Sequence, residues 1–221
     1  MTVNPVLEDT TLAAFISSKI CHDLAGQIGA INNGLELLEE ESDDDTRYYA
    51  LELINNSAKA AWAQLDFHRL AFGASSSLGA SVHLAHIEQV ARRYIENGKR
   101  RLHWQVEAIE VEKDQAKLAL ALLAVALTAL PAGGDFYVEF STTKMPRKQS
   151  SFKLGILCRG RSARIPERTA EIFRGKDHGG IDGHYVLPYY VARLASAASM
   201  KLFVSKEGED VVFTLQPRSG A

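Results

Sequence analysis

The chain has 221 residues, 46% of them hydrophobic and 24% charged, so it is long enough to bury one substantial core. A formal net charge of -2 and the lack of a basic stripe argue against nucleic acid or an anionic membrane as a main partner. The longest apolar run, LALALLAVALTAL, has about 13 residues, fewer than the ~20 that span a membrane, and the N-terminus lacks a secretory pattern. We therefore expect neither a membrane protein nor a secreted one.

The two cysteines, Cys21 and Cys158, both stand among apolar residues in the sequence. Such positions suit free thiols in a reducing compartment better than a disulfide framework. We therefore expect a cytoplasmic protein in which both cysteines are unpaired.

The first third of the sequence has the periodicity of two long helices. The first is expected over residues 12–41, where apolar residues recur three or four positions apart: Ile16, Ile20, Leu24, Ile28, Ile31, Leu35 and Leu38. At roughly 100° per residue this stripe stays within about 80° of Ile20, whereas His22 projects near 200°, on the opposite side. His22 is therefore expected to face outward.

An acidic turn, SDDD, separates the two helices, and Ser42 or one of the aspartates is expected to cap the second. This helix is expected to begin near Thr46 and to stop at Gly73. Its apolar face is predicted to consist of Leu51, Ile54, Ala58, Ala61, Leu65 and Leu70. A lone hairpin buries only one face of each helix, so we expect a homodimer in which two hairpins form a four-helix bundle.

The small, polar segment ASSSLGAS is typical of a linker, which divides the chain into a hairpin domain at 1–75 and a second domain at 76–221. In the second domain, helices are predicted over residues 82–98, 115–131, from about 166, and 186–198. Strands are predicted over residues 102–112, 135–143, 151–158, 200–206 and 210–217. The mixture predicts an α/β sandwich with helices on one face of a mixed sheet, and an α+β class for the whole chain.

Both regions resemble the catalytic core of sensor histidine kinases. His22-Asp23-Leu24 resembles the H-box, in which a histidine followed by an acidic residue accepts a phosphoryl group on a dimeric helical hairpin. AVALTALPAGG resembles the N-box, and RIPE resembles the end of the first glycine box. The closing run HYVLPYYVARLASAASMKLFVSKEGEDVVFTLQP resembles the final helix and hairpin of the kinase ATP-binding domain.

The positions that would touch nucleotide in such a kinase carry other residues. Val125 stands where the N-box has a Mg²⁺-binding asparagine, and Gly160 stands where an acidic residue recognises adenine. In the first glycine box, two glycines are replaced by Ser162 and Arg164. In the second, only Gly183 keeps its place: Tyr185 and Leu187 stand where glycines would be, and Pro188 removes a backbone donor. A Mg²⁺ triphosphate needs oxygen ligands and a close glycine backbone, so we expect no ATP binding.

A kinase framework that keeps its acceptor histidine and loses its nucleotide site is similar to the ChpT-type histidine phosphotransferases of alphaproteobacteria, whose pattern the run HDLxxxxGAINNGLELL matches closely. The resemblance implies a homodimeric phosphorelay protein. In such a relay, the receiver domain of a hybrid kinase passes a phosphoryl group to His22, which passes it to response regulators. The chain departs from kinases at Gln27, where they usually have proline, and at Gly26, where many have threonine or asparagine.

Two other functional classes stay open at this point. The chain can still be an ATP-dependent histidine kinase with an unusual pocket, which a nucleotide-binding measurement distinguishes. It can also be a non-catalytic dimeric scaffold for response regulators, which mutation of His22 distinguishes.

His22 has the chemistry of a phosphoryl acceptor. A free imidazole titrates near pH 6.5, so much of it is neutral and nucleophilic at neutral pH. The site needs no metal or cofactor of its own, because the acidic pocket of a receiver domain can bring the Mg²⁺. Asp23 is expected to orient the ring or hold a proton, and Lys19, one turn earlier, to neutralise phosphoryl charge.

The helix face of His22 is expected to carry almost no side chain, because Ala25, Gly26 and Gly29 lie three, four and seven positions after it. Two interior glycines cost roughly 1 kcal/mol each, a cost that clearance for a partner explains, although close packing inside the bundle is an alternative. Phe15, on the same face, is a candidate anchor for the receiver or a cap for the bundle end. The predicted docking surface consists of Phe15, Lys19, Ala25, Gly26, Gly29 and Asn33.

Two further patterns predict no site. The pairs His83 with His86 and His178 with His184 lack the additional ligands that a zinc site requires. A basic cluster is expected to be a solvated loop region that an acidic partner can also meet, and it consists of PRKQS, Arg159, Arg161 and Arg164.

Overall fold

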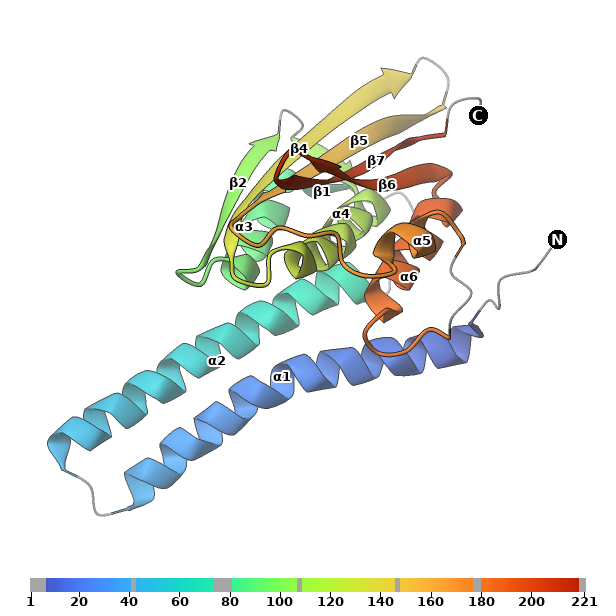
Figure 1. Cartoon of the computed structure of the whole chain (residues 1–221). Helices are drawn as coiled ribbons and strands as arrows, with labels where there is room; N and C mark the ends of the chain where they lie inside the picture. Colours follow the sequence, from blue (N-terminus) through green and yellow to red (C-terminus); the bar gives the residue numbers. More distant parts are fainter. Residues whose placement is uncertain are drawn as a thin grey trace.

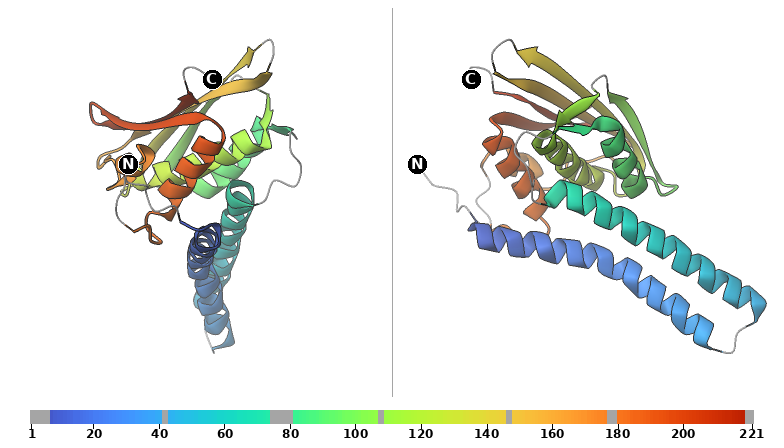
Figure 2. Two further views of the ribbon diagram at one scale, coloured as in Figure 1. Left: turned by 90° about the vertical axis from the view of Figure 1, so that its right-hand side faces the viewer. Right: turned by 180° about the vertical axis from the view of Figure 1, so that it is seen from behind.

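The structure is a computed structural model that describes residues 7–40, 43–73, 81–106, 109–145, 148–176 and 180–218. A long helical hairpin of α1 and α2 lies beneath a twisted sheet, and a layer of shorter helices fills the space between them (Figure 1). One end of the hairpin packs under this layer, while the last turns of α1 and the first turns of α2 project away from the rest of the molecule (Figures 1 and 2).

The hairpin consists of α1 (Asp9–Glu39) and α2 (Asp44–Phe72), so both predicted helices are confirmed with small shifts at their ends. The cap of α2 is an aspartate, as expected, because Asp43 accepts a hydrogen bond from the backbone N–H of Thr46 at 2.8 Å. This bond holds the pKa of Asp43 below its usual value. Ser42, the other candidate cap, lies outside the described residues. Gly73 ends α2 as predicted.

The two hairpin helices lie in close contact at Gly34, which is the one buried residue of α1 in the single chain. A Cβ atom at this position would lie 2.6 Å from Ile54 Cγ1 and 3.2 Å from the carbonyl oxygen of Ala50. Glycine is therefore required here for helix contact. The predicted apolar stripe of α1 is only partly covered, since Ile28 and Leu35 are about half exposed, at 50% and 47%.

The predicted buried face of α2 is wrong in part, because Leu51, Ala58 and Leu65 are exposed. The residues that are buried instead are Ala50, Ser57, Ala63, Asp66, Phe67, His68 and Ala71. The physical reason is that α2 has apolar residues on two sides. The first helix and the C-terminal domain cover one of these sides, and the other is left uncovered in the single chain.

A five-stranded mixed sheet forms the upper layer, in the order β2-β4-β5-β7-β6. Only β2 and β4 are parallel, and the other neighbours are antiparallel. The strands are β2 (Arg100–Val106), β4 (Gly134–Met145), β5 (Lys148–Arg159), β6 (Met200–Glu207) and β7 (Asp210–Pro217). The mixed sheet predicted from the sequence is confirmed.

A second, two-stranded sheet pairs β1 (Ser81–His83) with β3 (Glu110–Glu112) and was not predicted. The single strand predicted over residues 102–112 is wrong, because its two ends, β2 and β3, join different sheets. Runs of three residues are too short to show a period, so the sequence pattern could not reveal β1 or β3.

Four helices cover one face of the large sheet: α3 (Leu84–Ile95), α4 (Lys113–Ala126), α5 (Thr169–Phe173) and α6 (Val186–Ala197). All lie on the side of the hairpin, which confirms the predicted one-sided sandwich (Figure 1). The alternation along β7 shows the consequence, since Val211, Phe213 and Leu215 are fully buried against the helices. The predicted loop PRKQS is shorter than expected, because β5 begins at Lys148.

The hairpin and the C-terminal domain share a core at the C-terminal end of α2. Phe67 belongs to the same buried cluster as α3 and α4, and its ring stacks on Tyr94 of α3 with centroids 3.9 Å apart. At the start of α1, Arg193 of α6 pairs with Asp9 at 3.2 Å. The predicted boundary between residues 75 and 76 lies outside the described residues.

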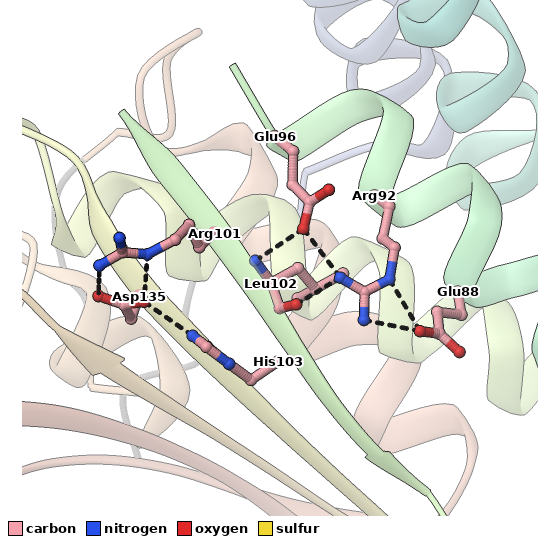
Figure 3. A network of polar contacts seen from close by, with 7 residues as sticks. All are labelled: Glu88, Arg92, Glu96, Arg101, Leu102, His103 and Asp135. Atoms are coloured by element: carbon pink, nitrogen blue, oxygen red, sulfur yellow. Dashed lines mark hydrogen bonds and ion pairs between the residues drawn. The ribbon is translucent and has the colours of Figure 1, made fainter. Parts of the chain in front are cut away.

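Two polar networks hold the parallel edge strand β2 (Figure 3). On the inner side, Arg92 of α3 donates a hydrogen bond to the carbonyl oxygen of Leu102 at 2.6 Å. On the outer side, Asp135 of β4 accepts from Arg101 at 2.8 Å and contacts His103 Nε2 at 2.7 Å. The Arg101 guanidinium holds the pKa of Asp135 well below its usual range.

Candidate functional site

His22 lies in the middle part of α1 with 86% of its side chain exposed, so the outward orientation predicted from the helix periodicity is confirmed. Its Nδ1 atom lies 3.6 Å from Oδ1 of Asp23. The ring therefore has one nitrogen beside a carboxylate, while its exposed side chain is accessible to a protein that docks on α1.

The Asp23 carboxylate contacts Lys19 and His68 as well as His22. Its side chain is only 17% exposed, and its Oδ1 forms an ion pair with Lys19 Nζ one helical turn away. Its second oxygen, Oδ2, lies 3.6 Å from Nε2 of His68 on α2. Lys19, which we expected to face an incoming phosphoryl group, is thus already engaged with Asp23.

His68 is the site residue that the sequence analysis missed. Its side chain is 4% exposed and packs among Phe67, Phe72 and Tyr94, with the Phe72 ring centroid 5.5 Å away. Burial lowers the pKa of the imidazole, with Asp23 opposing and Lys19 adding to that effect. Forty-six positions separate His68 from His22 in the sequence, so no local spacing pattern could join them.

The helix face around His22 is bare, as predicted. A Cβ atom built at Gly26 or Gly29 would meet nothing within 4 Å among the described residues, so neither glycine serves packing within the single chain. Ala25 and Asn33 are exposed on the same face. Phe15, the candidate anchor for the receiver or cap for the bundle end, is half-buried.

Comparison with known proteins identifies the family. The sequence profile described as Histidine phosphotransferase C-terminal domain matches residues 84–210. The protein phosphotransferase ChpT of Brucella abortus (strain 2308) is 36% identical over 217 residues, which cover 98% of this chain and 100% of that protein. The chain belongs to the histidine phosphotransferase family.

One solved structure agrees with the family assignment. A bacterial phosphotransferase, solved at 1.7 Å, superimposes with a TM-score of 0.83 and 35% identity, covering 97% of this chain and 100% of that one. A structure of Acinetobacter baumannii histidine kinase AdeS also aligns, with a TM-score of 0.44 and 13% identity over 90% of this chain and 98% of that one.

In this phosphotransferase, several residues at or near the positions that the kinase resemblance assigns to nucleotide contacts have structural roles of their own. Val125 of α4 is 0% exposed and belongs to the core. A Cβ atom at Gly160 would lie 2.7 Å from the carbonyl oxygen of Gly133, so this glycine is explained by backbone packing. Arg168 lies 4.3 Å over the ring of Tyr185. Pro188 is buried in the first turn of α6, where a missing N–H breaks no helical bond.

The described residues offer neither a metal cluster nor a membrane-spanning helix. No group of three or more histidine, cysteine, aspartate or glutamate side chains there is suited to hold a metal ion. His83 instead contacts Glu110 at 3.3 Å, and His178 lies outside the described ranges. None of the described helices has the length and apolar character needed to cross a bilayer.

The two cysteines differ in environment. Both are free thiols, as predicted. Cys158 is fully buried, and burial raises its pKa to about 12. The apolar environment expected for Cys21 is wrong, because this residue is exposed on α1.

Proposed function

We propose that this phosphotransferase is a cytoplasmic homodimer in which His22 accepts a phosphoryl group from the receiver domain of a hybrid kinase and passes it to response regulators. The observation that supports this proposal best is the exposure of His22, at 86%, on a helix face where Gly26 and Gly29 leave open space. A receiver domain can approach such a face without displacing any side chain.

The two ring nitrogens of His22 have different roles in this proposal: Nδ1 carries the proton, and Nε2 is the nucleophile. With its proton on Nδ1, beside Asp23, the neutral ring keeps a free electron pair on Nε2. That pair attacks the phosphorus of the receiver's aspartyl phosphate, and the phosphorus–oxygen bond breaks with its electrons leaving on the receiver's carboxylate. The product is an Nε2-phosphoryl imidazolium, whose positive charge lies beside the negative Asp23.

The chain needs no nucleotide and no metal of its own in this proposal. The receiver domain brings Mg²⁺ in its acidic pocket, as the family resemblance implies. The absence of ATP binding is supported by Val125, which packs in the core where a kinase would present a metal-binding asparagine. The same packing weighs against the alternative of an ATP-dependent kinase.

Homodimerisation is supported by apolar surface that the single chain leaves uncovered on the hairpin. Exposed apolar residues of α2 follow a heptad-like spacing, which is typical of a helix–helix interface. They are Tyr48, Leu51, Ala58, Trp62 and Leu65, and Ile28 and Leu35 add to them from α1. A contiguous apolar surface of this kind is typical of a protein interface. Two hairpins would bury it in a four-helix bundle.

Transfer from a phosphorylated receiver domain tests the proposal. The wild-type chain should acquire phosphate that is labile in acid and stable in alkali, as a phosphohistidine is. His22→Ala should abolish this uptake and leave the fold intact, because an exposed side chain contributes little to stability. His86→Ala, which removes another exposed helical histidine, is the matched control and should be labelled normally. Undiminished labelling of His22→Ala would refute the assignment and favour a scaffold that binds regulators without transfer.

A further inference from the structure

We infer that His68 is a positioning residue that holds the Asp23 carboxylate against the ring of His22. This inference rests on the proposed role of His22 and adds a second histidine, from the other helix of the hairpin. The Asp23 carboxylate lies between the two imidazoles. Its Oδ1 is 3.6 Å from Nδ1 of His22, and its Oδ2 is 3.6 Å from Nε2 of His68. Each distance exceeds a direct hydrogen bond by a few tenths of an ångström, so a small rotation of Asp23 closes either contact.

The protonation state of His68 follows from its surroundings. Its Nδ1 atom is buried and has no hydrogen-bond partner among the described residues, whereas its Nε2 atom faces Asp23. An ionised carboxylate only accepts hydrogen bonds, so the proton of a neutral His68 belongs on Nε2. Nδ1 is then a buried acceptor without a donor among aromatic rings, and this arrangement costs free energy that another interaction of the ring must offset. The contact between Nε2–H and the Asp23 carboxylate is such an interaction.

Burial favours the neutral form of His68 over the opposing charge of Asp23. Asp23 and Lys19 face it from α1 and Tyr94 from α3, and its own helix contributes the apolar rings of Phe67 and Phe72. Burial lowers the pKa of His68 against the attraction of Asp23. A neutral donor orients the carboxylate without cancelling its charge. Asp23 can therefore still stabilise the positive ring that forms when His22 is phosphorylated.

The packing of His68 gives the C-terminal domain a part in the acceptor site. Tyr94 belongs to α3 of that domain, its ring lies 5.8 Å from His68, and it stacks on Phe67. Burial raises the pKa of Tyr94 to about 12, so its hydroxyl stays neutral and adds no charge to the site. The C-terminal domain thus holds the His68 ring in place through Tyr94, and the ring in turn orients the Asp23 carboxylate.

Two substitutions separate positioning from packing. His68→Phe keeps an aromatic ring among Phe67, Phe72 and Tyr94 and removes the donor. His68→Gln loses the ring and places an amide N–H close to the position of Nε2. If His68 positions Asp23, the initial rate of phosphoryl transfer from a phosphorylated receiver should fall about 10- to 100-fold in His68→Phe, the cost typical of losing a group that orients a reactive side chain. His68→Gln should retain most of the rate while being the less stable variant.

Nitrogen-15 NMR of the histidine rings gives a readout that requires no phosphoryl transfer. Wild-type His68 should carry its proton on Nε2, and wild-type His22 should favour the Nδ1–H tautomer. In His68→Phe the preference of His22 for Nδ1–H should weaken, and in His68→Gln it should persist. An Nδ1–H proton on wild-type His68 would overturn the inference even if both variants failed to fold.

Other outcomes also decide the question. Wild-type transfer rates and an unchanged His22 tautomer in His68→Phe would overturn the inference and leave the proposed function standing. Rates that fall only in step with lost stability in both variants, with the tautomer unchanged, would make His68 a packing residue. Full labelling of His22→Ala, in contrast, would remove the proposed function itself.

Discussion

Helices α1 and α4 differ in how much of their apolar surface the single chain buries. Helix α1 has 31 residues, and only Gly34 is buried in the single chain. Helix α4 has 14 residues and buries ten of them between the sheet and α2: Ala116, Leu118, Ala119, Leu120, Ala121, Leu122, Leu123, Ala124, Val125 and Ala126. The C-terminal domain, together with the end of α2, therefore buries its apolar residues within the single chain, whereas the hairpin leaves apolar surface exposed.

The two helices also carry the positions that the resemblance compares with two kinase sites, the nucleotide site on α4 and the phosphoryl-acceptor site on α1. Val125, which the resemblance to kinases aligns with a nucleotide contact, is a core residue of α4. His22, at the position of the acceptor, remains exposed on α1 beside Asp23. The proposed acceptor thus lies on the exposed helix α1, and the residue compared with a nucleotide contact lies on the buried helix α4.

The largest effect should come from charging the uncovered side of the hairpin. Leu51→Asp places a carboxylate on the exposed apolar surface of α2. Burying a leucine contributes about 1.5–3 kcal/mol, and each dimer loses two, so the dissociation constant should rise on the order of 10²-fold or more. Sedimentation equilibrium measures this change. Phe203→Asp, at an exposed apolar position of β6, is the matched control and should leave the dimer intact. A Leu51→Asp chain that dimerises like wild type would show that α2 is covered by something other than a second copy.

A smaller effect, confined to transfer, should come from filling the bare face of α1. Gly29→Leu adds a side chain where nothing lies within 4 Å, and leucine is a better helix former than glycine, so stability should hold or rise. A receiver pushed away by even an ångström loses the in-line approach of about 3 to 3.5 Å, which should cost on the order of 10²-fold in rate. Single-turnover kinetics with a phosphorylated receiver measure this.

Gly29→Ala is the control for Gly29→Leu, because its single methyl group should gain stability and keep most of the rate. Dissociation or unfolding of Gly29→Leu would mean that Gly29 packs inside the dimeric bundle. Unchanged folding together with unchanged transfer would mean that the receiver docks elsewhere, and Phe15 would be the next position to test.

Particular residues show how far the sequence could predict this molecule. The outward position of His22 and the Asp43 cap follow from local rules, namely helix periodicity and the preference of aspartate for N-cap positions. The exposure of Leu51 and the burial of His68 do not follow from such rules. Both depend on which side of α2 the C-terminal domain covers, which is a contact between segments distant in the sequence. The exposure of Cys21 was missed because its apolar sequence neighbours lie on other faces of the same helix.

The smallest effect should be a pH dependence of stability that originates at His68. An imidazole in the unfolded chain binds its proton near pH 6.5, while the native His68 binds it only at lower pH because its pKa is lowered by burial. The unfolded state therefore holds more protons as the pH falls through this window, and the native state loses stability. Three groups face the ring. The effects of Asp23 and Lys19 are already part of the lowered pKa of His68, and Tyr94 stays neutral because its own pKa is raised.

Denaturant unfolding at pH 7.5 and 5.5 measures this pH dependence. The wild-type chain should lose more stability between the two values than His68→Phe, which has no imidazole to protonate. His86→Phe removes an exposed histidine instead and should behave like the wild type. Equal losses in wild type and His68→Phe would mean that His68 is not held neutral by its surroundings.

The location of the transferred phosphoryl group tests the central claim most directly. The wild-type chain would be incubated in parallel with Mg²⁺ and ATP alone and with a phosphorylated receiver domain, and peptides kept in mild alkali would be analysed by mass spectrometry. The account predicts phosphate on His22 with the receiver domain and none with ATP alone. Phosphate on a different residue, or phosphate on His22 from ATP alone, would contradict it.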